Sequence, residues 1–248
     1  MFSELYIRKI GISRDLPPED CVARLPAVRQ IIAQGGLELK KQVTFLVGEN
    51  GMGKSTLLEA VAIALGFNPE GGTWNYSFST NDSHAKLYRH LRVSRGIERP
   101  RDGYFFRAES FYNAATYLEE LENTPYCGGV LNSYGGKSLH QRSHGESFMA
   151  LVENRFGGDG IYLLDEPESA LSPARVMELM CWMDELRKKH SQFIIATHSP
   201  VLITFPGAEI LELTKDGMRS VNYQETELFQ LTRRFLNDPE RMLKYMLE

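Results

Sequence analysis

The chain of 248 residues carries 28 basic and 32 acidic side chains, which gives a net charge of −4 at pH 7, and 42% of its residues are hydrophobic. This composition argues against a generally basic nucleic-acid-binding protein, and no apolar run approaches the roughly 20 residues that span a bilayer. The three cysteines, Cys21, Cys127 and Cys181, lack metal-binding spacing, and the first residues lack a secretion signal. We therefore expect a cytoplasmic protein with reduced thiols and no membrane insertion.

Strand and helix patterns alternate along the first half of the chain. Residues 5–12 predict a strand, and residues 43–47 predict a short apolar strand of the kind buried in the middle of a parallel sheet. A helix is expected over residues 54–65, ended by Gly66. Between residues 67 and 101 the periodicity is lost among Gly, Asn, Ser and Arg, which indicates antiparallel strands and loops.

The second half continues this alternation. The expected elements are a strand at 104–109 with a helix to about 122, a loop at 124–137, a helix at 147–155, strands at 161–164, 193–196 and 210–213, a hairpin turn at 215–217 into 218–222, and helices at 226–236 and after Pro239. Another helix begins after strand 161–164, because Ser172 fits the N-cap and Pro173 fits the first helical position. This order predicts an α/β protein with a mostly parallel sheet.

A glycine-rich segment follows the apolar strand 43–47 directly. It reads Gly48-Glu49-Asn50-Gly51-Met52-Gly53-Lys54-Ser55-Thr56. Its glycines let the backbone wrap with the N–H groups turned inward, and the following helix directs its positive dipole end at a bound phosphate. Lys54 is expected to reach the β- and γ-phosphates of a nucleotide, and Ser55 to hold Mg²⁺. The segment predicts a nucleotide-binding phosphate loop.

Polar side chains follow two later strands. Asp165 and Glu166 end the strand 161–164, where Asp165 can bind the Mg²⁺ shell and Glu166 can polarise an attacking water molecule. His198 follows the next strand, 33 residues after Asp165, and is expected within reach of the γ-phosphate. The pattern favours a hydrolytic site, although loop acids and a structural histidine are the ordinary alternatives for each feature taken alone.

A last segment, Ser143-His144-Gly145-Glu146-Ser147, opens the helix that leads toward Asp165. Together with the phosphate loop, the Asp165-Glu166 pair, the loop Glu168-Ser-Ala-Leu-Ser172 and His198, it makes the chain resemble ATP-binding-cassette ATPases from about residue 40 to 205. The segment is similar to the signature of small bacterial predicted ATPases grouped with the SMC-like, double-strand-break-repair and overcoming-lysogenisation-defect branches. It differs from the Leu-Ser-Gly-Gly-Gln of most transporter cassettes.

The resemblance implies a P-loop NTPase head spanning residues 1–248 as one domain, with a mostly parallel central sheet, an antiparallel β portion and a helical signature subdomain at about 104–155. It also implies hydrolysis of ATP with Mg²⁺ in a head-to-tail homodimer that holds two ATP molecules between its subunits. Each γ-phosphate would meet Lys54, Glu166 and His198 of one chain and Ser143 and Gly145 of the other. ATP would close this dimer and hydrolysis would release it.

The chain departs from the transporter cassettes at three places. No aromatic residue occurs in 24–34 to stack on adenine, and Arg14 is a weaker candidate for that contact. Glu109 stands at about the place of the usual coupling glutamine, and Ser172 replaces the aspartate that ends the Ser-Ala-Leu loop. How adenine is held is therefore left open by the sequence.

A run of arginines precedes residue 102, and it consists of Arg89, Arg92, Arg95, Arg99 and Arg101. The run fits a solvated surface, a contact with a partner protein or a contact with a nucleic-acid backbone. Three functions stay open. The chain is an ATPase switch for a partner effector such as a nuclease in DNA repair or mobile-element defence, the motor subunit of a transporter with a separate membrane chain, or a scaffold that binds ATP. A scaffold has no need of the water-activating Glu166.

Overall fold

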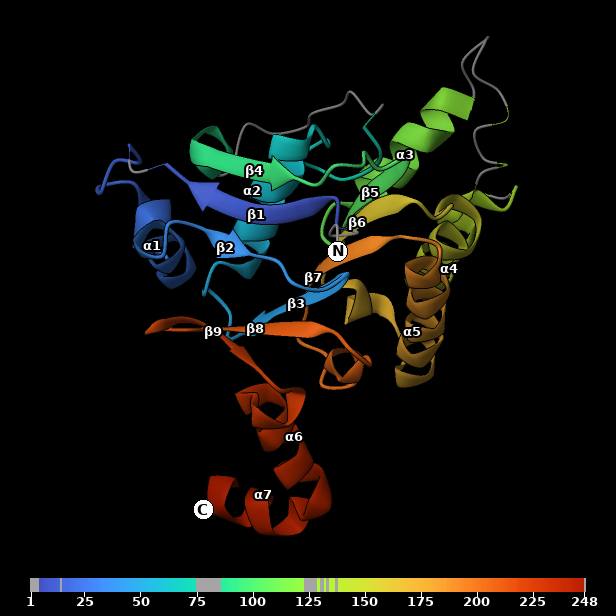
Figure 1. Ribbon diagram of the computed structural model, residues 1–248. Helices are drawn as coiled ribbons and strands as arrows, with labels where there is room; N and C mark the ends of the chain where they lie inside the picture. The colour runs from blue at the N-terminus through green and yellow to red at the C-terminus, as the bar shows by residue number, and fades with distance from the viewer. Residues whose placement is uncertain are drawn as a thin grey trace.

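The protein was analysed as a computed structural model that describes residues 5–13, 15–74, 86–122, 129, 132, 134–136 and 138–247. A six-stranded sheet in the order β5-β6-β7-β3-β8-β9 forms its centre (Figure 1). Its strands are β3 (Val43–Gly48), β5 (Asp102–Arg107), β6 (Gly160–Asp165), β7 (Gln192–Ala196), β8 (Glu209–Thr214) and β9 (Gly217–Val221). The first five strands in this order pair in parallel, and β9 pairs antiparallel with β8, so the predicted sheet and its terminal hairpin are confirmed.

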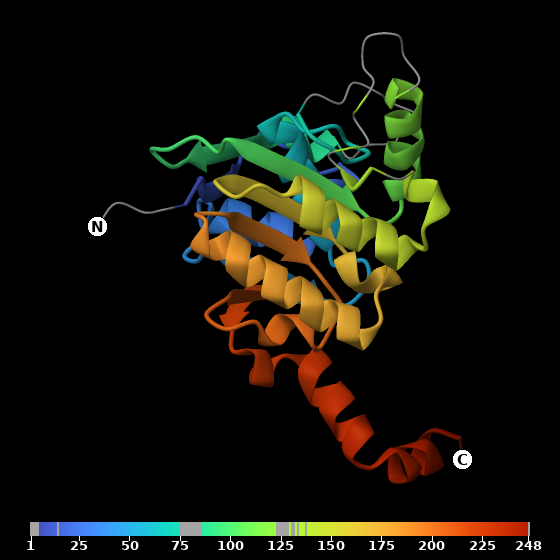
Figure 2. The ribbon, with the colours of Figure 1, turned by 90° about the vertical axis from the view of Figure 1, so that its right-hand side faces the viewer.

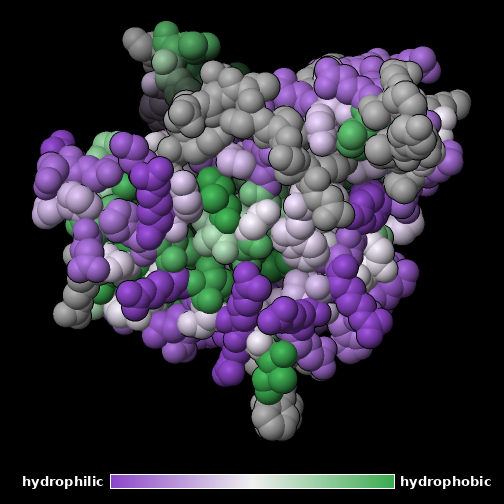
Figure 3. Space-filling model, turned by 90° about the horizontal axis from the view of Figure 1, so that it is seen from above, coloured by the Kyte–Doolittle hydropathy of each residue, from purple (hydrophilic) through white to green (hydrophobic). Residues whose placement is uncertain are grey.

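A second, antiparallel sheet lies above the first in Figure 1, in the order β2-β1-β4. It consists of β1 (Ile7–Ile12), β2 (Leu37–Glu38) and β4 (Leu91–Arg95). The side chain of Gln192 joins the sheets, because it accepts a hydrogen bond from Ile7 N at 2.8 Å and donates one to Ile7 O at 3.0 Å. Seen from above, apolar side chains gather in the middle of this face and are bordered by hydrophilic ones (Figure 3).

Helices cover both faces of the central sheet (Figure 2). On one side α2 (Lys54–Leu65) lies between the two sheets and α1 (Pro26–Ala33) packs beside β1, β8 and β9. On the other side lie α3 (Phe111–Glu122), α4 (His144–Arg155) and α5 (Pro173–Lys188). The bounds of α2 match the prediction, and Ser172 caps α5 as expected. The sequence patterns did not predict α1 or β2, and α4 begins three residues before the expected start at residue 147.

Two further helices, α6 (Glu227–Asn237) and α7 (Pro239–Leu247), follow β9 and project away from the body of the molecule (Figures 1 and 2). Thr226 caps α6, because its side chain accepts a hydrogen bond from Phe229 N at 3.2 Å. Neither helix contains a buried residue. Within the described part of the chain, no helix combines the length and the apolar character that crossing a membrane would need.

Asp102 fastens β5 to the segment that joins α4 to β6. Its carboxylate accepts hydrogen bonds from Arg155 at 2.7 Å, from Gly157 N at 3.0 Å and from the Tyr162 hydroxyl at 2.8 Å. Burial alone would raise the pKa of Asp102, but the Gly157 N–H, the Arg155 charge and the Tyr162 hydroxyl together hold it below its usual value. The ionised carboxylate therefore stabilises the fold.

We expect Asp102→Asn to lower the free energy of unfolding by about 1–3 kcal/mol at pH 7, because the charged acceptor of these bonds is lost. The folded-state pKa lies below the unfolded value of about 3.9, so the stabilisation is fully present above about pH 5 and disappears as the pH falls through the folded-state pKa. Urea denaturation of both proteins across this pH range measures the difference. A difference that stays constant down to pH 3 would contradict this account.

Candidate nucleotide-binding site

The predicted functional residues meet because β6, β7 and β3 are neighbours in the sheet and point in the same direction. The segments that leave these strands are hydrogen bonded to the adjacent strand ends. Glu166 N donates to Ala196 O at 2.9 Å, and Thr197 N donates to Leu46 O at 3.1 Å. The carboxyl ends of the three strands therefore bring the phosphate loop, the Asp165-Glu166 pair and His198 to one edge of the sheet.

The phosphate loop has the backbone shape that its glycines predict. Gly48, Gly51 and Gly53 have φ angles of 142°, 79° and 92°, a region that residues with a Cβ rarely adopt. At Gly48 a Cβ would also lie 2.3 Å from the carbonyl oxygen of Leu213 on the neighbouring strand β8. Gly53 caps α2 without a side-chain hydrogen bond, so the first backbone N–H groups of the helix lack a side-chain acceptor from the cap, an arrangement that favours anion binding.

Lys54 is buried at the start of α2, with 4% of its surface exposed. Its ammonium group donates hydrogen bonds to Gly48 O at 2.7 Å and to Glu49 O at 3.0 Å. Burial lowers the pKa of Lys54, while the carboxylates of Glu166 and Asp165 oppose that change. The side chain is therefore held against the phosphate loop, and its predicted contact with the β- and γ-phosphates stays a prediction. Asn50 is exposed in the same loop, and Thr56 is half-buried within the first turn of the helix.

Ser55 and Asp165, the residues predicted to hold Mg²⁺, are in direct contact. The Ser55 hydroxyl donates a hydrogen bond to Asp165 Oδ1 at 2.9 Å, across 110 residues of sequence. Burial raises the pKa of Asp165 to about 6, although the Ser55 hydrogen bond and the Arg107 charge act in the opposite direction. A hydroxyl and a buried carboxylate are hard oxygen ligands, so this pair fits Mg²⁺, which takes few protein ligands besides water and phosphate oxygens.

Glu166 and His198 face each other next to this pair. Glu166 has the unusual backbone angles φ 49° and ψ 53°, a left-handed conformation that is found mainly where the surrounding structure enforces it. Its Oε1 lies 3.7 Å from Nε2 of His198, too far for a hydrogen bond. That Nε2 atom is buried and has no hydrogen-bond partner among the described residues. Burial, followed by the charge of Lys54, lowers the pKa of His198, so its imidazole is neutral at pH 7.

Glu168 is a site residue to which the sequence patterns assigned no role. Its Oε1 accepts a hydrogen bond from the backbone N–H of His198 at 2.5 Å, and Oε2 is buried with no partner within the described ranges. The Glu168 carboxylate also acts to raise the pKa of both Lys54 and His198. The available signal was a third acid directly after Asp165-Glu166-Pro167, at the end of a buried strand.

Arg107 is a second residue that the sequence did not single out. It lies opposite Asp165 in the β5–β6 register, and its guanidinium forms ion pairs with Glu59 of α2 at 2.8 Å and with Glu109 at 3.3 Å. The Glu109 side chain is 85% exposed, so its suggested coupling role stays a prediction. Arg14, the suggested adenine contact, lies outside the described residues.

Ser143 and Glu146 form the start of α4. The Ser143 hydroxyl donates to Glu146 Oε2 at 2.8 Å and accepts from Glu146 N at 3.3 Å, and Ser143 N donates to the same carboxylate at 2.9 Å. This reciprocal capping box fixes the first turn of the helix. Gly145 packs against the 3-10 turn after Glu166, since a Cβ there would lie 2.7 Å from Ala170 O. No described hydrogen bond joins Ser143 to the phosphate loop of the same chain.

Two family profiles match parts of the chain, one described as "AAA domain" over residues 27–108 and one described as "AAA domain, putative AbiEii toxin, Type IV TA system" over residues 145–204. The chain is 24% identical over 214 residues to the hemin import ATP-binding protein HmuV of Idiomarina loihiensis, which covers 80% of this chain and 82% of that protein. It is 27% identical over 182 residues to the L-cystine transport system ATP-binding protein TcyN of Escherichia coli, covering 65% and 72%. It also matches the energy-coupling factor transporter ATP-binding protein EcfA2 of Methanospirillum hungatei, at 27% identity over 46% of that protein.

Solved structures share the fold at low sequence identity. CbiO1 of Clostridium perfringens, part of the ABC transporter complex CbiONQ, matches with a TM-score of 0.50 and 17% identity over 98% of this chain and 100% of that chain. MJ1267, an ATP-binding cassette of an ABC transporter, matches with a TM-score of 0.50 and 15% identity over 97% and 99%. The curated relatives support placing the chain in the ATP-binding-cassette superfamily, and the solved structures support the same fold. The narrower resemblance of the chain to the SMC-like and repair branches stays a prediction.

We expect Glu168→Ala to release the segment that contains His198, because the variant removes the acceptor of the His198 backbone N–H. Exchange of the His198 amide hydrogen should become about tenfold faster or more, whereas Glu168→Gln, which keeps an acceptor oxygen, should preserve most of the protection. Both variants should lower the pKa of His198 further, because both remove the carboxylate charge. Amide exchange and histidine titration by NMR measure both effects, and equal exchange in all three proteins would contradict the assignment.

Proposed function

We propose that this cassette protein binds and hydrolyses ATP. The observation that carries the proposal is the convergence of Lys54, the Ser55–Asp165 pair and the Glu166–His198 pair at one edge of the sheet. Curated relatives at 24–27% identity are named ATP-binding proteins, which supports the choice of nucleotide. A structural scaffold that only binds ATP fits less well, since it has no use for a water-activating carboxylate.

The chain's own residues define the parts of the reaction. The N–H groups of the phosphate loop and the Lys54 ammonium bind and orient the phosphates. Glu166 orients and polarises the attacking water molecule. The neutral His198 places a ring nitrogen near the γ-phosphate. Mg²⁺, held by Ser55 and Asp165, would neutralise charge on the phosphate oxygens when bound. The phosphate groups are thereby positioned rather than covalently attacked by the protein.

We further propose that the complete site forms only in a head-to-tail homodimer. Helix α4, which Ser143 caps, begins on the side of the molecule toward which the parallel strands point (Figure 2), and its start carries the positive end of the helix dipole. The hydrogen bonds of the Ser143 side chain are made to Glu146 within its own turn, and none of them reaches the phosphate loop of the same chain, which supports a role toward a phosphate held by another chain. ATP would join two subunits, and its hydrolysis would release them.

The biological role proposed first is a switch that controls a partner effector in DNA repair or mobile-element defence. The signature type and the toxin-related profile over residues 145–204 support it. The named transport functions of HmuV and TcyN support the second candidate, the motor subunit of a transporter with a separate membrane chain.

Capture of native partners with the Glu166→Gln protein and ATP separates the two roles, because a captured nuclease or DNA supports the first role and a captured permease supports the second. The exposed arginines at 89, 92, 95, 99 and 101 offer a surface for either partner.

We expect Glu166→Gln to trap ATP and to make the protein dimeric, because the variant keeps the phosphate contacts but loses the group that activates water. Light scattering with ATP and Mg²⁺ should show about twice the monomer mass, and mass without nucleotide should be that of the monomer. The matched control is Lys54→Ala in the Glu166→Gln protein, which should remain monomeric. A Glu166→Gln protein that stays monomeric at saturating ATP and micromolar concentration would refute the dimer.

We expect Ser143→Arg to abolish hydrolysis while ATP affinity of the monomer stays near that of the wild type, because the bulky side chain blocks only the phosphate held by the partner. The Ser143→Thr control keeps the N-cap and should retain most activity, while loss of the cap itself costs only about 1 kcal/mol of stability. Phosphate release and fluorescent-ATP titration measure the two quantities. Loss of ATP binding by the monomeric variant would place Ser143 in the chain's own nucleotide site.

A further inference from the structure

Helix α2 carries two polar side chains that contact the ends of neighbouring strands. Ser55 and Glu59 stand four positions apart, so they lie on one face of the helix, about one turn from each other. Ser55 donates its hydrogen bond of 2.9 Å to Asp165, the last residue of β6. Glu59 forms its ion pair of 2.8 Å with Arg107, the last residue of β5. Because Arg107 and Asp165 are register partners, two parallel contacts join one helix face to two adjacent strand ends.

Arg107 also binds the segment that follows α2. Its guanidinium donates a hydrogen bond of 3.3 Å to the carbonyl oxygen of Pro69. Three residues later the same segment pairs with β5, because Gly72 N donates to Phe105 O at 2.8 Å and Phe105 N donates to Gly72 O at 3.0 Å. Strand β5 therefore holds α2 in its second turn, through Glu59, and also just beyond its C-terminal end.

The Ser55–Asp165 contact depends on the rotation of α2 about its axis. A serine hydroxyl lies one bond beyond Cβ, so its side chain has little reach with which to follow a moving partner. Cα atoms lie about 2.3 Å from a helix axis, so a rotation of about 20° moves them by about 0.8 Å and moves the hydroxyl by more. Mg²⁺ demands near-ideal octahedral geometry, with ligands at about 2.0–2.1 Å. A small rotation of α2 is therefore enough to spoil the pair of ligands that fits Mg²⁺.

The Glu59–Arg107 ion pair is the contact better able to fix this rotation. Only 10% of the Glu59 side chain and 16% of the Arg107 side chain are exposed, so solvent screens their attraction little. The Arg107 charge also acts to lower the pKa of Asp165, which agrees with its place beside that carboxylate. The charged pair thus lies next to the candidate metal ligands and is held by both the helix and the strand.

We propose that Arg107 and Glu59 are positioning residues for the Mg²⁺ site. Their ion pair sets the rotation of α2 at which Ser55 and Asp165 face the same ion. Both act through the helix and the strand rather than as ligands themselves, in the way that outer-shell partners orient metal ligands. The inference rests on the proposed function, because it takes Ser55 and Asp165 as the ligands of the Mg²⁺ that accompanies ATP.

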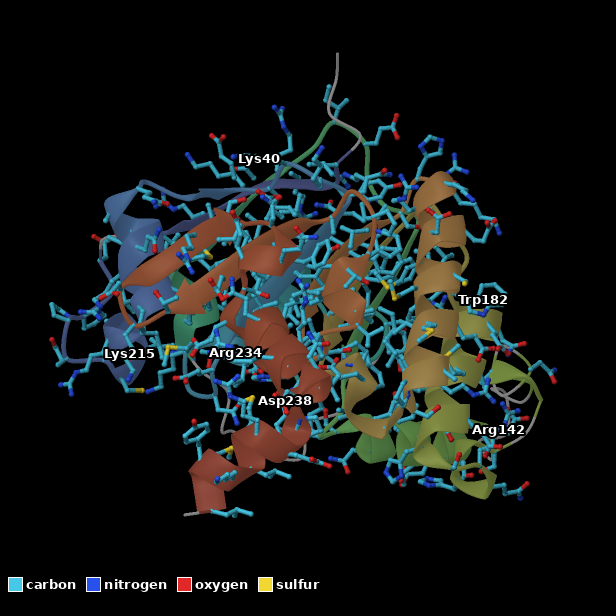
Figure 4. All side chains as sticks on the ribbon, turned by 90° about the horizontal axis from the view of Figure 1, so that it is seen from below. Lys40, Arg142, Trp182, Lys215, Arg234 and Asp238 are labelled. Atoms are coloured by element: carbon cyan, nitrogen blue, oxygen red, sulfur yellow. The ribbon has the colours of Figure 1, made fainter. Side chains whose placement is uncertain are left out.

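The ion pair is separated from the exposed helices α6 and α7 by the central sheet. The apolar residues of α2 belong to the core between the two sheets, whereas Leu228 and Phe229 of α6 pack against the core on the other side. Seen from below, Arg234 of α6 and Asp238 at the α6–α7 junction lie on the near side of the molecule (Figure 4). Substitutions at Arg107 and Glu59 therefore leave the surface of α6–α7 unchanged.

The first experiment measures metal binding. Arg107→Met alone would leave the buried Glu59 carboxylate without the Arg107 charge, so the main variant combines Arg107→Met with Glu59→Met. Its complex with the ATP analogue AMPPNP should bind Mn²⁺, which suits the same oxygen ligands as Mg²⁺, about tenfold more weakly than the wild-type complex. AMPPNP affinity in EDTA should change by less than about twofold, because the N–H groups of the phosphate loop stay in place.

Electron paramagnetic resonance measures bound Mn²⁺, and competition with fluorescent ATP measures AMPPNP affinity. Both are carried out at pH 8.5, which keeps the Asp165 carboxylate, whose pKa is about 6, ionised. The matched control is Arg155→Met, which breaks another ion pair of β5, with Asp102 at 2.7 Å. That pair is similarly shielded but lies at the opposite end of the strand. The control should lower stability and leave the Mn²⁺ affinity unchanged.

The second experiment tests the coupling of the two contacts without nucleotide or metal. Ser55→Ala should lower the folding equilibrium constant of the wild-type protein by about fivefold, because it removes the hydrogen bond to Asp165. In the protein with Arg107→Met and Glu59→Met, the same substitution should lower it by less than about twofold, because that hydrogen bond is already weakened. Urea denaturation of the four proteins measures the difference.

The outcomes separate this inference from the proposed function. If the wild-type protein binds neither AMPPNP nor, in its presence, Mn²⁺, the proposed ATP site is wrong. If it binds both, and the main variant loses no more Mn²⁺ affinity than the Arg155→Met control, the site stands and the positioning role is wrong. Loss of AMPPNP affinity in EDTA would assign the ion pair to the phosphate loop instead, and additive effects of Ser55→Ala would show that the two contacts are independent. Either result would overturn the inference.

Discussion

The parallel pairing of β6, β7 and β3 is the constraint on which the rest of the site depends. Its register sets Asp165 beside Ala196 and Ala196 beside Leu46, so three chain segments leave the sheet at the same height. Backbone hydrogen bonds from Glu166 and Thr197 then hold two of these segments against neighbouring strands. Residues more than 100 positions apart in the sequence, such as Ser55 and Asp165, thereby form a hydrogen bond with each other.

The sequence predicted the helices around this site where their ends are determined by local backbone geometry. The bounds of α2 followed from the glycines before it and Gly66 after it, and the start of α5 followed from Ser172 and Pro173. Helix α1 was missed because it is only eight residues long and too short for a clear periodicity, although Ala27, Val28 and Ile31 are buried. The early start of α4 had a signal, since Ser143 and Glu146 have the spacing of a capping box.

What the sequence could not supply is the environment of each charged group. The role of Glu168 depends on a contact with His198, 30 residues away, and that contact exists only because β6 and β7 are adjacent. The pKa of Asp165 is raised and that of His198 lowered chiefly by burial, which no residue pattern encodes. The sequence also could not predict that Arg107 lies beside Asp165, because that position follows from the β5–β6 register.

The two halves of the proposed dimeric site are in physical contact within one chain. Gly145, at the start of α4, packs on the carbonyl of Ala170, and the same short turn contains Glu168, whose carboxylate holds the backbone of His198. A side chain at Gly145 would displace this turn, because the space for its Cβ is already filled. The surface that we propose meets the partner's phosphate is therefore connected through this one turn to the backbone of His198, which we propose faces the chain's own phosphate. Closure of the dimer around one nucleotide would in this way change the position of His198 at the other nucleotide site.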